Sequence, residues 1–241
     1  MSLQRSFAGA ALLPATALLA LLLAAKTAPA EDFYYLAMFG SQTTPADPNY
    51  SHTFASFVHA TGEGPCPPAF VVEDCFTISW LPADLKVRTR ALLPECGHNF
   101  GLHETLDYAL RSGERVSVWG PYRIEPRLYY EAARQRDVLE SGRVRYKAID
   151  SGYPTDRVSN CIHAVASAVD GYRMRVASPW FGETASWAVL QRSEPSILDT
   201  GKTHDWVFTY LGLGQYPLTR RDYENPRVGP VRTAVKTALG E

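Results

Sequence analysis

Strand-like and helix-like segments follow one another along this chain without a regular strand–helix alternation. Short apolar or alternating runs predict strands, and apolar residues at helical spacing predict helices. A chain that mixes the two without repeated βαβ units favours an α+β fold over a doubly wound sheet. The expected strands cover residues 33–39, 52–58, 76–81, 116–119 and 144–149, and the expected helices cover residues 102–111, 125–139, 161–169, 185–191 and 204–211.

Several of these boundaries depend on glycine and proline. Gly113 follows the helix at 102–111, and Pro126 stands in the first turn of the helix at 125–139, where proline is favoured. Gly120-Pro121 is expected to end the strand at 116–119. Strands 52–58 and 76–81 would form a hairpin with a long loop. No repeat or linker divides residues 31–241, so we expect a single domain there.

The first thirty residues have the layout of a secretory signal peptide. Arg5 provides a positive start, Phe7 to Ala25 carries no charge, and Ala28-Pro29-Ala30 has the small residues that a signal peptidase recognises. We expect cleavage after Ala30 and a secreted or periplasmic protein with no stable membrane span. The alternative is an uncleaved membrane anchor, since the apolar stretch of 19 residues is close to the ~20 that span a bilayer.

The charge balance excludes one class of partner. The chain of 241 residues has 24 Lys and Arg against 25 Asp and Glu, a formal net charge of −1. Nucleic-acid binding lacks its usual electrostatic drive here.

Export changes the interpretation of the four cysteines, because disulfides form in oxidising compartments. Cys66 and Cys75 enclose a short loop and are candidates for a local disulfide, and the four cysteines together permit three pairings. Cys96-Gly97-His98 with His103 lacks the paired spacing of a zinc site, so no metal is expected.

Cys161 has the best position for chemistry. It opens an apolar helix entered through Ser159-Asn160, and a helix N-terminus favours thiolate over thiol. Backbone N–H groups at the same end, with Asn160 and His163 nearby, would stabilise an oxyanion or support the site. A distant strand carries His52, which would accept the thiol proton. No G-x-S-x-G, P-loop, G-x-G-x-x-G or H-E-x-x-H motif is present.

The segments Tyr50-Ser51-His52-Thr53-Phe54 and Tyr146 through Asn160-Cys161 resemble the circularly permuted NlpC/P60 (papain-like) cysteine hydrolases. In that family the strand with the base histidine precedes the helix with the nucleophile. The resemblance implies a small antiparallel sheet packed on helices, with Cys161 as nucleophile and His52 as base. The third polar residue of the family has no clear match, although Thr77 and Ser79 are on the appropriate strand.

Each candidate also has a structural alternative. A cysteine on an apolar helix is most often a core residue or a disulfide partner, and His52 would equally well bond a loop carbonyl. His163 is two residues after Cys161, so the two side chains do not share a helix face. His204 is an alternative base, but Thr203-His204-Asp205 has the pattern of a helix start.

Two functions follow. The first is an exported, thiol-dependent hydrolase or acyltransferase that needs no cofactor and acts on an amide or ester bond, in a cell-wall peptide or a lipid. The second is a secreted, non-catalytic binding or structural module on the same scaffold.

Overall fold

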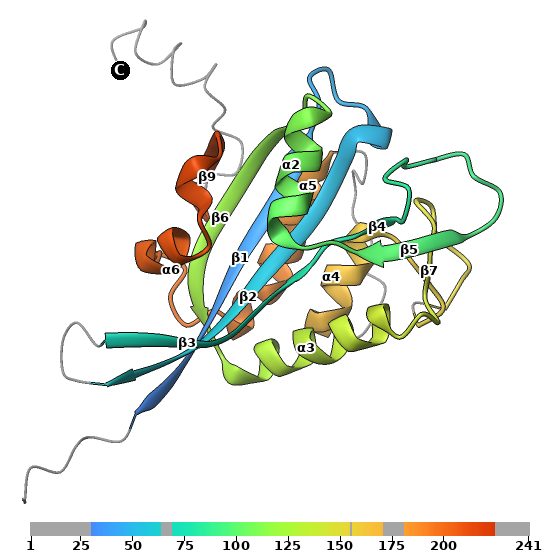
Figure 1. Cartoon of the computed structure of the whole chain (residues 1–241). Coiled ribbons are helices and arrows are strands. Elements are labelled where there is room, and N and C mark those ends of the chain that lie inside the picture. The colour runs from blue at the N-terminus through green and yellow to red at the C-terminus, as the bar shows by residue number, and fades with distance from the viewer. Residues whose placement is uncertain (1–29, 64–68, 155, 171–180, 225–241) are drawn as a thin grey trace, which may run out of the picture.

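The computed structural model describes residues 30–63, 69–154, 156–170 and 181–224 (Figure 1). Its strands are β1 (Glu31–Gln42), β2 (Ser51–Glu63), β3 (Ala69–Ile78), β4 (Trp80–Pro82), β5 (Glu95–Asn99), β6 (Arg115–Ile124), β7 (Arg145–Tyr146), β8 (Val158–Ser159) and β9 (Leu218–Arg221). Its α-helices are α2 (Leu102–Arg111), α3 (Pro126–Glu140), α4 (Cys161–Asp170), α5 (Gly182–Ser193) and α6 (Asp205–Tyr210), and its short 3-10 helices are η1 (Pro48–Tyr50), η2 (Glu194–Ser196) and η3 (Leu213–Gln215). The expected α+β class is confirmed.

The main sheet has five strands in the order β3-β2-β1-β6-β9. β2 and β3 form an antiparallel hairpin, and β1 pairs antiparallel with both β2 and β6. The predicted pairing of the two strands is confirmed, but the strand expected at 76–81 is divided: β3 begins at Ala69 and ends at Ile78, and Trp80–Pro82 form β4 in a second sheet, so the expected long loop is wrong. Only the last pair, β6 with β9, is parallel, because the chain returns to this edge through α5 and α6. The sheet is therefore antiparallel over four of its five strands.

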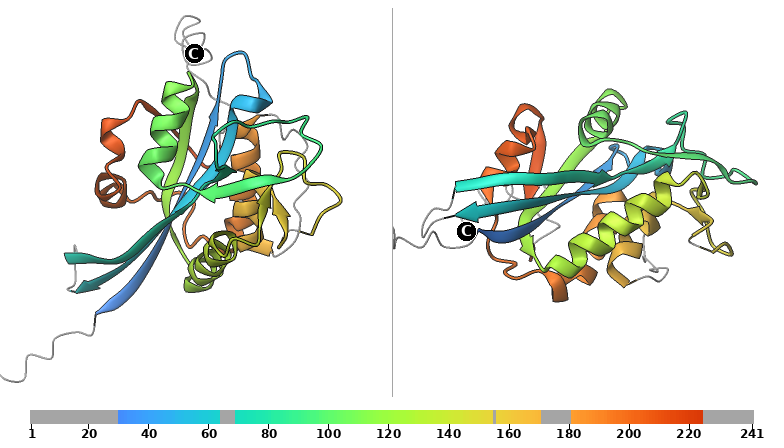
Figure 2. Two further views of the ribbon diagram at one scale, coloured as in Figure 1. Left: turned by 45° about the vertical axis from the view of Figure 1, so that its right-hand side comes forward. Right: turned by 60° about the horizontal axis from the view of Figure 1, so that its bottom comes forward.

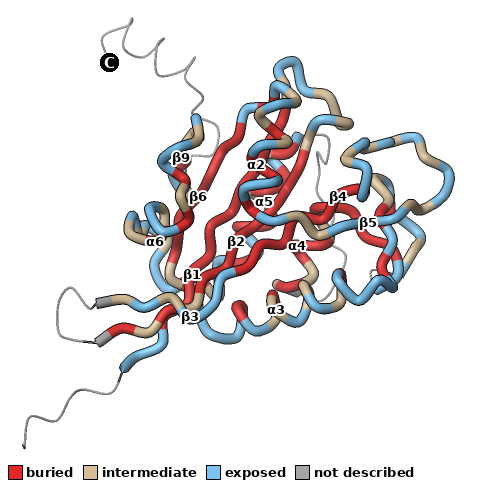
Figure 3. The backbone as a smooth tube through the Cα atoms, in the orientation of Figure 1, coloured by how far each residue is buried: buried red, intermediate tan, exposed pale blue. Residues whose placement is uncertain are grey.

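Helices cover both faces of this sheet, as the right-hand view of Figure 2 shows. Alternate residues of β1 enter two separate cores, as the pleat requires. Tyr34, Leu36 and Met38 join the core shared with α3, α4 and α5, whereas Tyr35 and Phe39 join the core shared with α2, α6 and η3. Figure 3 shows the resulting continuous burial along the central strands. The face of the strand on which a side chain lies thus determines which helices it contacts.

A smaller sheet, in the order β4-β5-β7-β8, holds the start of α4. β8 leads directly into Asn160 and Cys161, and the indole Nε1 of Trp80 in β4 donates to the carbonyl of Ser159 (3.2 Å). Trp80 is buried, so this bond ties the entry of α4 to the protein interior.

Most predicted elements are confirmed, and the boundaries show where the prediction was wrong. The helix at 102–111 is correct at both ends, and those at 125–139 and 161–169 differ by at most one residue at an end. β6 does not stop at Gly120-Pro121. It continues to Ile124, because Gly120 adopts a φ of +86° at a bulge against β1. The strand expected at 144–149 is reduced to β7, two residues long.

The predicted Cys66–Cys75 disulfide stays a prediction, because one of its two cysteines is not described. Cys75 is exposed in β3, where it lies opposite Val58, and forms no disulfide with a described residue, whereas Cys66 lies outside the described residues. Cys96 and Cys161 likewise form no disulfide with a described residue. Residues 1–29, which hold the predicted signal peptide, lie outside the described part as well. None of the helices that the structure describes is long and apolar enough to cross a bilayer.

Candidate functional site

The start of helix α4 is built by a polar cap. The side-chain oxygen of Asn160 accepts from the backbone N–H of His163 (2.8 Å), which is the usual role of an N-cap asparagine. Asp150 is buried and accepts from the Asn160 backbone N–H (3.1 Å) and from the Asn160 side-chain amide (3.2 Å). These bonds fix the turn that delivers Cys161 as the first residue of the helix.

Cys161 is 8% exposed and belongs to the core formed with α3, α4 and α5. Burial raises the pKa of its thiol to about 11, and backbone N–H groups of Thr53 and Ile162 offset only part of that effect. Burial, and after it the charge of Cys161, raise the pKa of the buried Tyr146 phenol beside this thiol. Burial at this helix N-terminus thus disfavours the thiolate that the sequence predicts.

His52 is 3% exposed and lies in the opposite core. Its ring stacks on Phe54 at 5.3 Å, and its Nε2 is 2.9 Å from the hydroxyl of Ser79. The hydroxyl of Thr105 in α2 donates to the same Ser79 oxygen (2.7 Å). Burial lowers the pKa of His52 to about 3, so the imidazole is neutral at physiological pH. Its Nδ1 has no hydrogen-bond partner in the described structure.

The predicted pair Cys161–His52 is not assembled, because the two side chains are on opposite faces of the main sheet. Thr53, the next residue of β2, points to the face of α4 and α5, where its hydroxyl accepts from Ser186 (2.9 Å). His52 points to α2 through Ser79 and Thr105. Successive side chains of β2 point to opposite faces of the sheet, and the face that contacts α4 carries Thr53 and not His52. The expected base and the expected nucleophile are therefore separated by the sheet.

His163 and Asp150 form the one histidine–carboxylate pair next to Cys161 among the described residues. The His163 Nδ1 donates to the Asp150 carboxylate at 2.6 Å. His163 thus supports the cap of α4 through its contacts with Asn160 and Asp150. Asn160 is likewise a cap.

His204 lies far from this site in the fold. It is the N-cap of α6, and its ring packs edge-on against Tyr35 (4.9 Å) on the α2 face of the sheet. Burial lowers the pKa of His204, assisted by the charges of Lys202 and Arg123. The structure does not bring this alternative base to Cys161 either.

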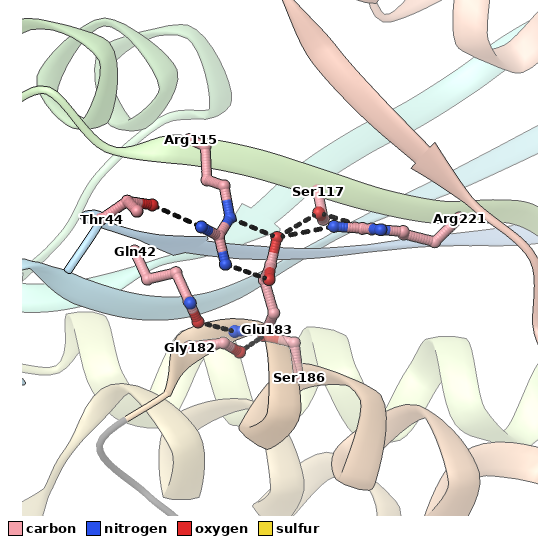
Figure 4. A network of polar contacts seen from close by, with 8 residues as sticks. All are labelled: Gln42, Thr44, Arg115, Ser117, Gly182, Glu183, Ser186 and Arg221. Carbon is pink, nitrogen blue, oxygen red and sulfur yellow. Dashed lines mark hydrogen bonds and ion pairs between the residues drawn. The ribbon is translucent and has the colours of Figure 1, made fainter. Parts of the chain in front are cut away.

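A polar network lies at the start of α5 (Figure 4). The Glu183 carboxylate accepts from Arg115 (2.9 Å), Ser117 (2.6 Å) and Arg221 (3.1 Å), which come from β6 and β9. Burial acts to raise the pKa of Glu183, but the hydrogen bonds from Arg115 and Ser117 and the two positive charges lower it below the ordinary value. This network fastens α5 to the sheet.

A close backbone approach accompanies the network. Gly182 packs on β1 and β2 so tightly that an added Cβ would lie 2.1 Å from the carbonyl oxygen of Ser41 and 2.8 Å from that of His52. The predicted helix at 185–191 begins three residues too late to include Gly182 and Glu183. Glu183, which follows Trp180-Phe181-Gly182 in the sequence, could have indicated the earlier helix start, since carboxylates are favoured in the first turn of a helix.

A second buried carboxylate, Glu114, faces α2. It is 4% exposed, and one of its oxygens accepts from the Ser41 hydroxyl (2.5 Å), whereas the other has no hydrogen-bond partner within the described residues. Burial raises the pKa of Glu114 to about 7, which the Ser41 hydrogen bond partly opposes. No sequence pattern marks this residue.

Groups of three or more His, Cys, Asp or Glu side chains that could hold a metal ion do not occur among the described residues. His98 and His103 instead pack against Phe100 and Tyr216. No protein-family model matches this chain, and neither a curated protein nor a solved structure matches it.

Proposed function

We propose that this protein is an exported, non-catalytic binding or structural module in which Cys161 is a packing residue. The main support for the proposal is the direction in which His52 points from β2. Its side chain faces α2, whereas Cys161 lies on the other face of the sheet with α4 and α5. A thiol hydrolase requires a base within hydrogen-bond reach of its nucleophile. On this proposal the chain is a non-catalytic variant of the scaffold that the permuted NlpC/P60 hydrolases use.

The protonation states support the same conclusion. With a pKa of about 11, roughly one Cys161 in ten thousand is a thiolate at pH 7. With a pKa of about 3, His52 has little tendency to take up a proton from any donor. Both groups favour their neutral forms, so neither contributes to a thiolate–imidazolium pair.

Export remains part of the proposal. β1 begins at Glu31, immediately after the expected cleavage point, so removal of residues 1–30 would leave every described strand and helix complete. The binding or structural role would then be exercised in a secreted or periplasmic setting.

The test measures the reactivity of Cys161 in the native protein. Iodoacetamide is applied at pH 7.5, and alkylation of each cysteine is followed by mass spectrometry, with the exposed Cys96 as internal reference. His52→Gln and His163→Gln are compared with the parent, because His163 is the histidine on the cap of α4. We expect Cys96 to react and Cys161 to stay unmodified in all three proteins. Rapid alkylation of Cys161 that either histidine variant slows would contradict the proposal and favour the hydrolase.

A further inference from the structure

The loop between β4 and β5, residues 83–94, projects from one end of the molecule (Figure 1) and carries two adjacent leucines in water. We call it the leucine loop. Leu92 is 89% exposed and Leu93 is 77% exposed, which makes them the two most exposed large apolar residues described. Ile149, in the neighbouring β7–β8 segment, is 47% exposed. Adjacent exposed leucines are costly in water and mark a site of interaction.

The leucine loop is held in this shape by its own contacts. The ammonium of Lys147 donates to the carbonyl oxygens of Ala91 and Leu92. Arg88 forms ion pairs with Asp84 (2.5 Å) and Glu95 (2.6 Å), at the two ends of the loop. These contacts hold the backbone before and after the two leucines, so the leucines stay away from the core.

The surroundings of the leucines are basic. Residues 83–95, 143–154, 156 and 157, here called the basic lobe, contain seven Lys and Arg against four Asp and Glu, in a chain whose formal net charge is −1. One of the four acids, Asp150, is buried against His163. Six of the cations form no ion pair with any described residue: Lys86, Arg90, Arg143, Arg145, Lys147 and Arg157. The positive charge is therefore concentrated around the leucine loop.

We propose that the leucine loop docks on the surface of an anionic phospholipid bilayer. Leu92 and Leu93 enter the boundary between headgroups and acyl chains, and the basic lobe lies against the lipid phosphates. Apolar side chains flanked by Lys and Arg bind anionic interfaces in this manner. A projecting loop with two leucines suits a bilayer better than a protein partner, because a stable protein interface buries about 800 Å² per partner. This inference is independent of whether Cys161 is reactive.

Binding to vesicles tests the proposal. The chain from Glu31 to Glu241 is used, because every described element lies there and the apolar stretch Phe7 to Ala25 would bind lipid by itself. Co-flotation is measured with vesicles of phosphatidylcholine alone and with vesicles containing equal parts of phosphatidylglycerol. We expect binding to the anionic vesicles only, weakened by added salt because screening reduces the attraction.

Matched variants locate the contact. Leu92→Ser with Leu93→Ser should weaken binding at least about tenfold, since both side chains lose apolar burial. The control Leu198→Ser, at an exposed leucine outside the basic lobe, should leave it unchanged. Arg90→Gln and Arg145→Gln should each weaken binding about fivefold, and Arg111→Gln and Arg127→Gln should not. Failure to bind anionic vesicles, or equal binding by the double leucine variant, would overturn the proposal.

Discussion

The buried carboxyl of Glu114 should make the stability of the fold depend on pH, and this dependence can be measured. Its carboxyl is 4% exposed, lacks a partner for one oxygen within the described structure, and has its pKa raised by burial to about 7. The folded state therefore holds a proton that the unfolded state releases near pH 4.5. Stability from this group is complete below that pH and is lost as the pH rises to 7 and above. The shift corresponds to about 3 kcal/mol of unfolding free energy.

Glu114→Gln removes this titration while the amide oxygen can still accept from the Ser41 hydroxyl. Urea unfolding of parent and variant is measured from pH 4.5 to pH 8.5, and the difference between the two unfolding free energies is plotted against pH. We expect that difference to change by about 3 kcal/mol in favour of the variant as the pH rises. Other titrating groups cancel in the difference, and Glu125→Gln, at an exposed carboxylate, serves as the control. Parallel curves for parent and Glu114→Gln would refute the reasoning.

Three further predictions concern packing and buried charge. Glu183→Gln should lower the unfolding free energy at pH 7 by about 3 kcal/mol, measured by urea denaturation, because it breaks the ion pairs to Arg115 and Arg221. The loss should shrink as the pH falls below the ordinary range of a glutamate, since the lowered pKa of Glu183 means that its stabilisation disappears on protonation. Gly182→Ala should cost about 3 kcal/mol in the same assay, because the new methyl group meets backbone oxygen atoms; an unchanged midpoint would show that α5 can move. His52→Asn should reduce the loss of stability on acidification below pH 6.5, because the unfolded state takes up a proton that the buried ring refuses; identical acid transitions would contradict this.

The sequence predicted the elements well where local chemistry decides them. Pro126 and Gly113 mark helix ends that depend on backbone geometry alone, and the structure agrees at both. Gly120-Pro121 misled the prediction because the same glycine that ends a strand also permits the bulge through which β6 continues.

The prediction of the candidate site failed because the pattern of one strand does not show which helix packs on each of its faces. His52 and Phe54 share a face of β2, as the alternation of side chains along a strand requires, but alternation does not say which face α4 covers. That choice is made by the packing of α4 and α5 against Thr53 and Ala55. Glu183 and Glu114 escaped notice because their partners are 38 to 73 residues away along the chain.

The pH profile of Cys161 alkylation tests the central claim most directly. Initial rates of iodoacetamide modification at Cys161 are measured from pH 5 to pH 10 on the folded protein, and circular dichroism at each pH confirms that the fold persists. Because burial raises the pKa of this thiol to about 11, we expect negligible modification below pH 9 and no inflection in that range. A rapid reaction with a midpoint below about pH 7 would establish a thiolate at the start of α4 and would contradict the non-catalytic assignment.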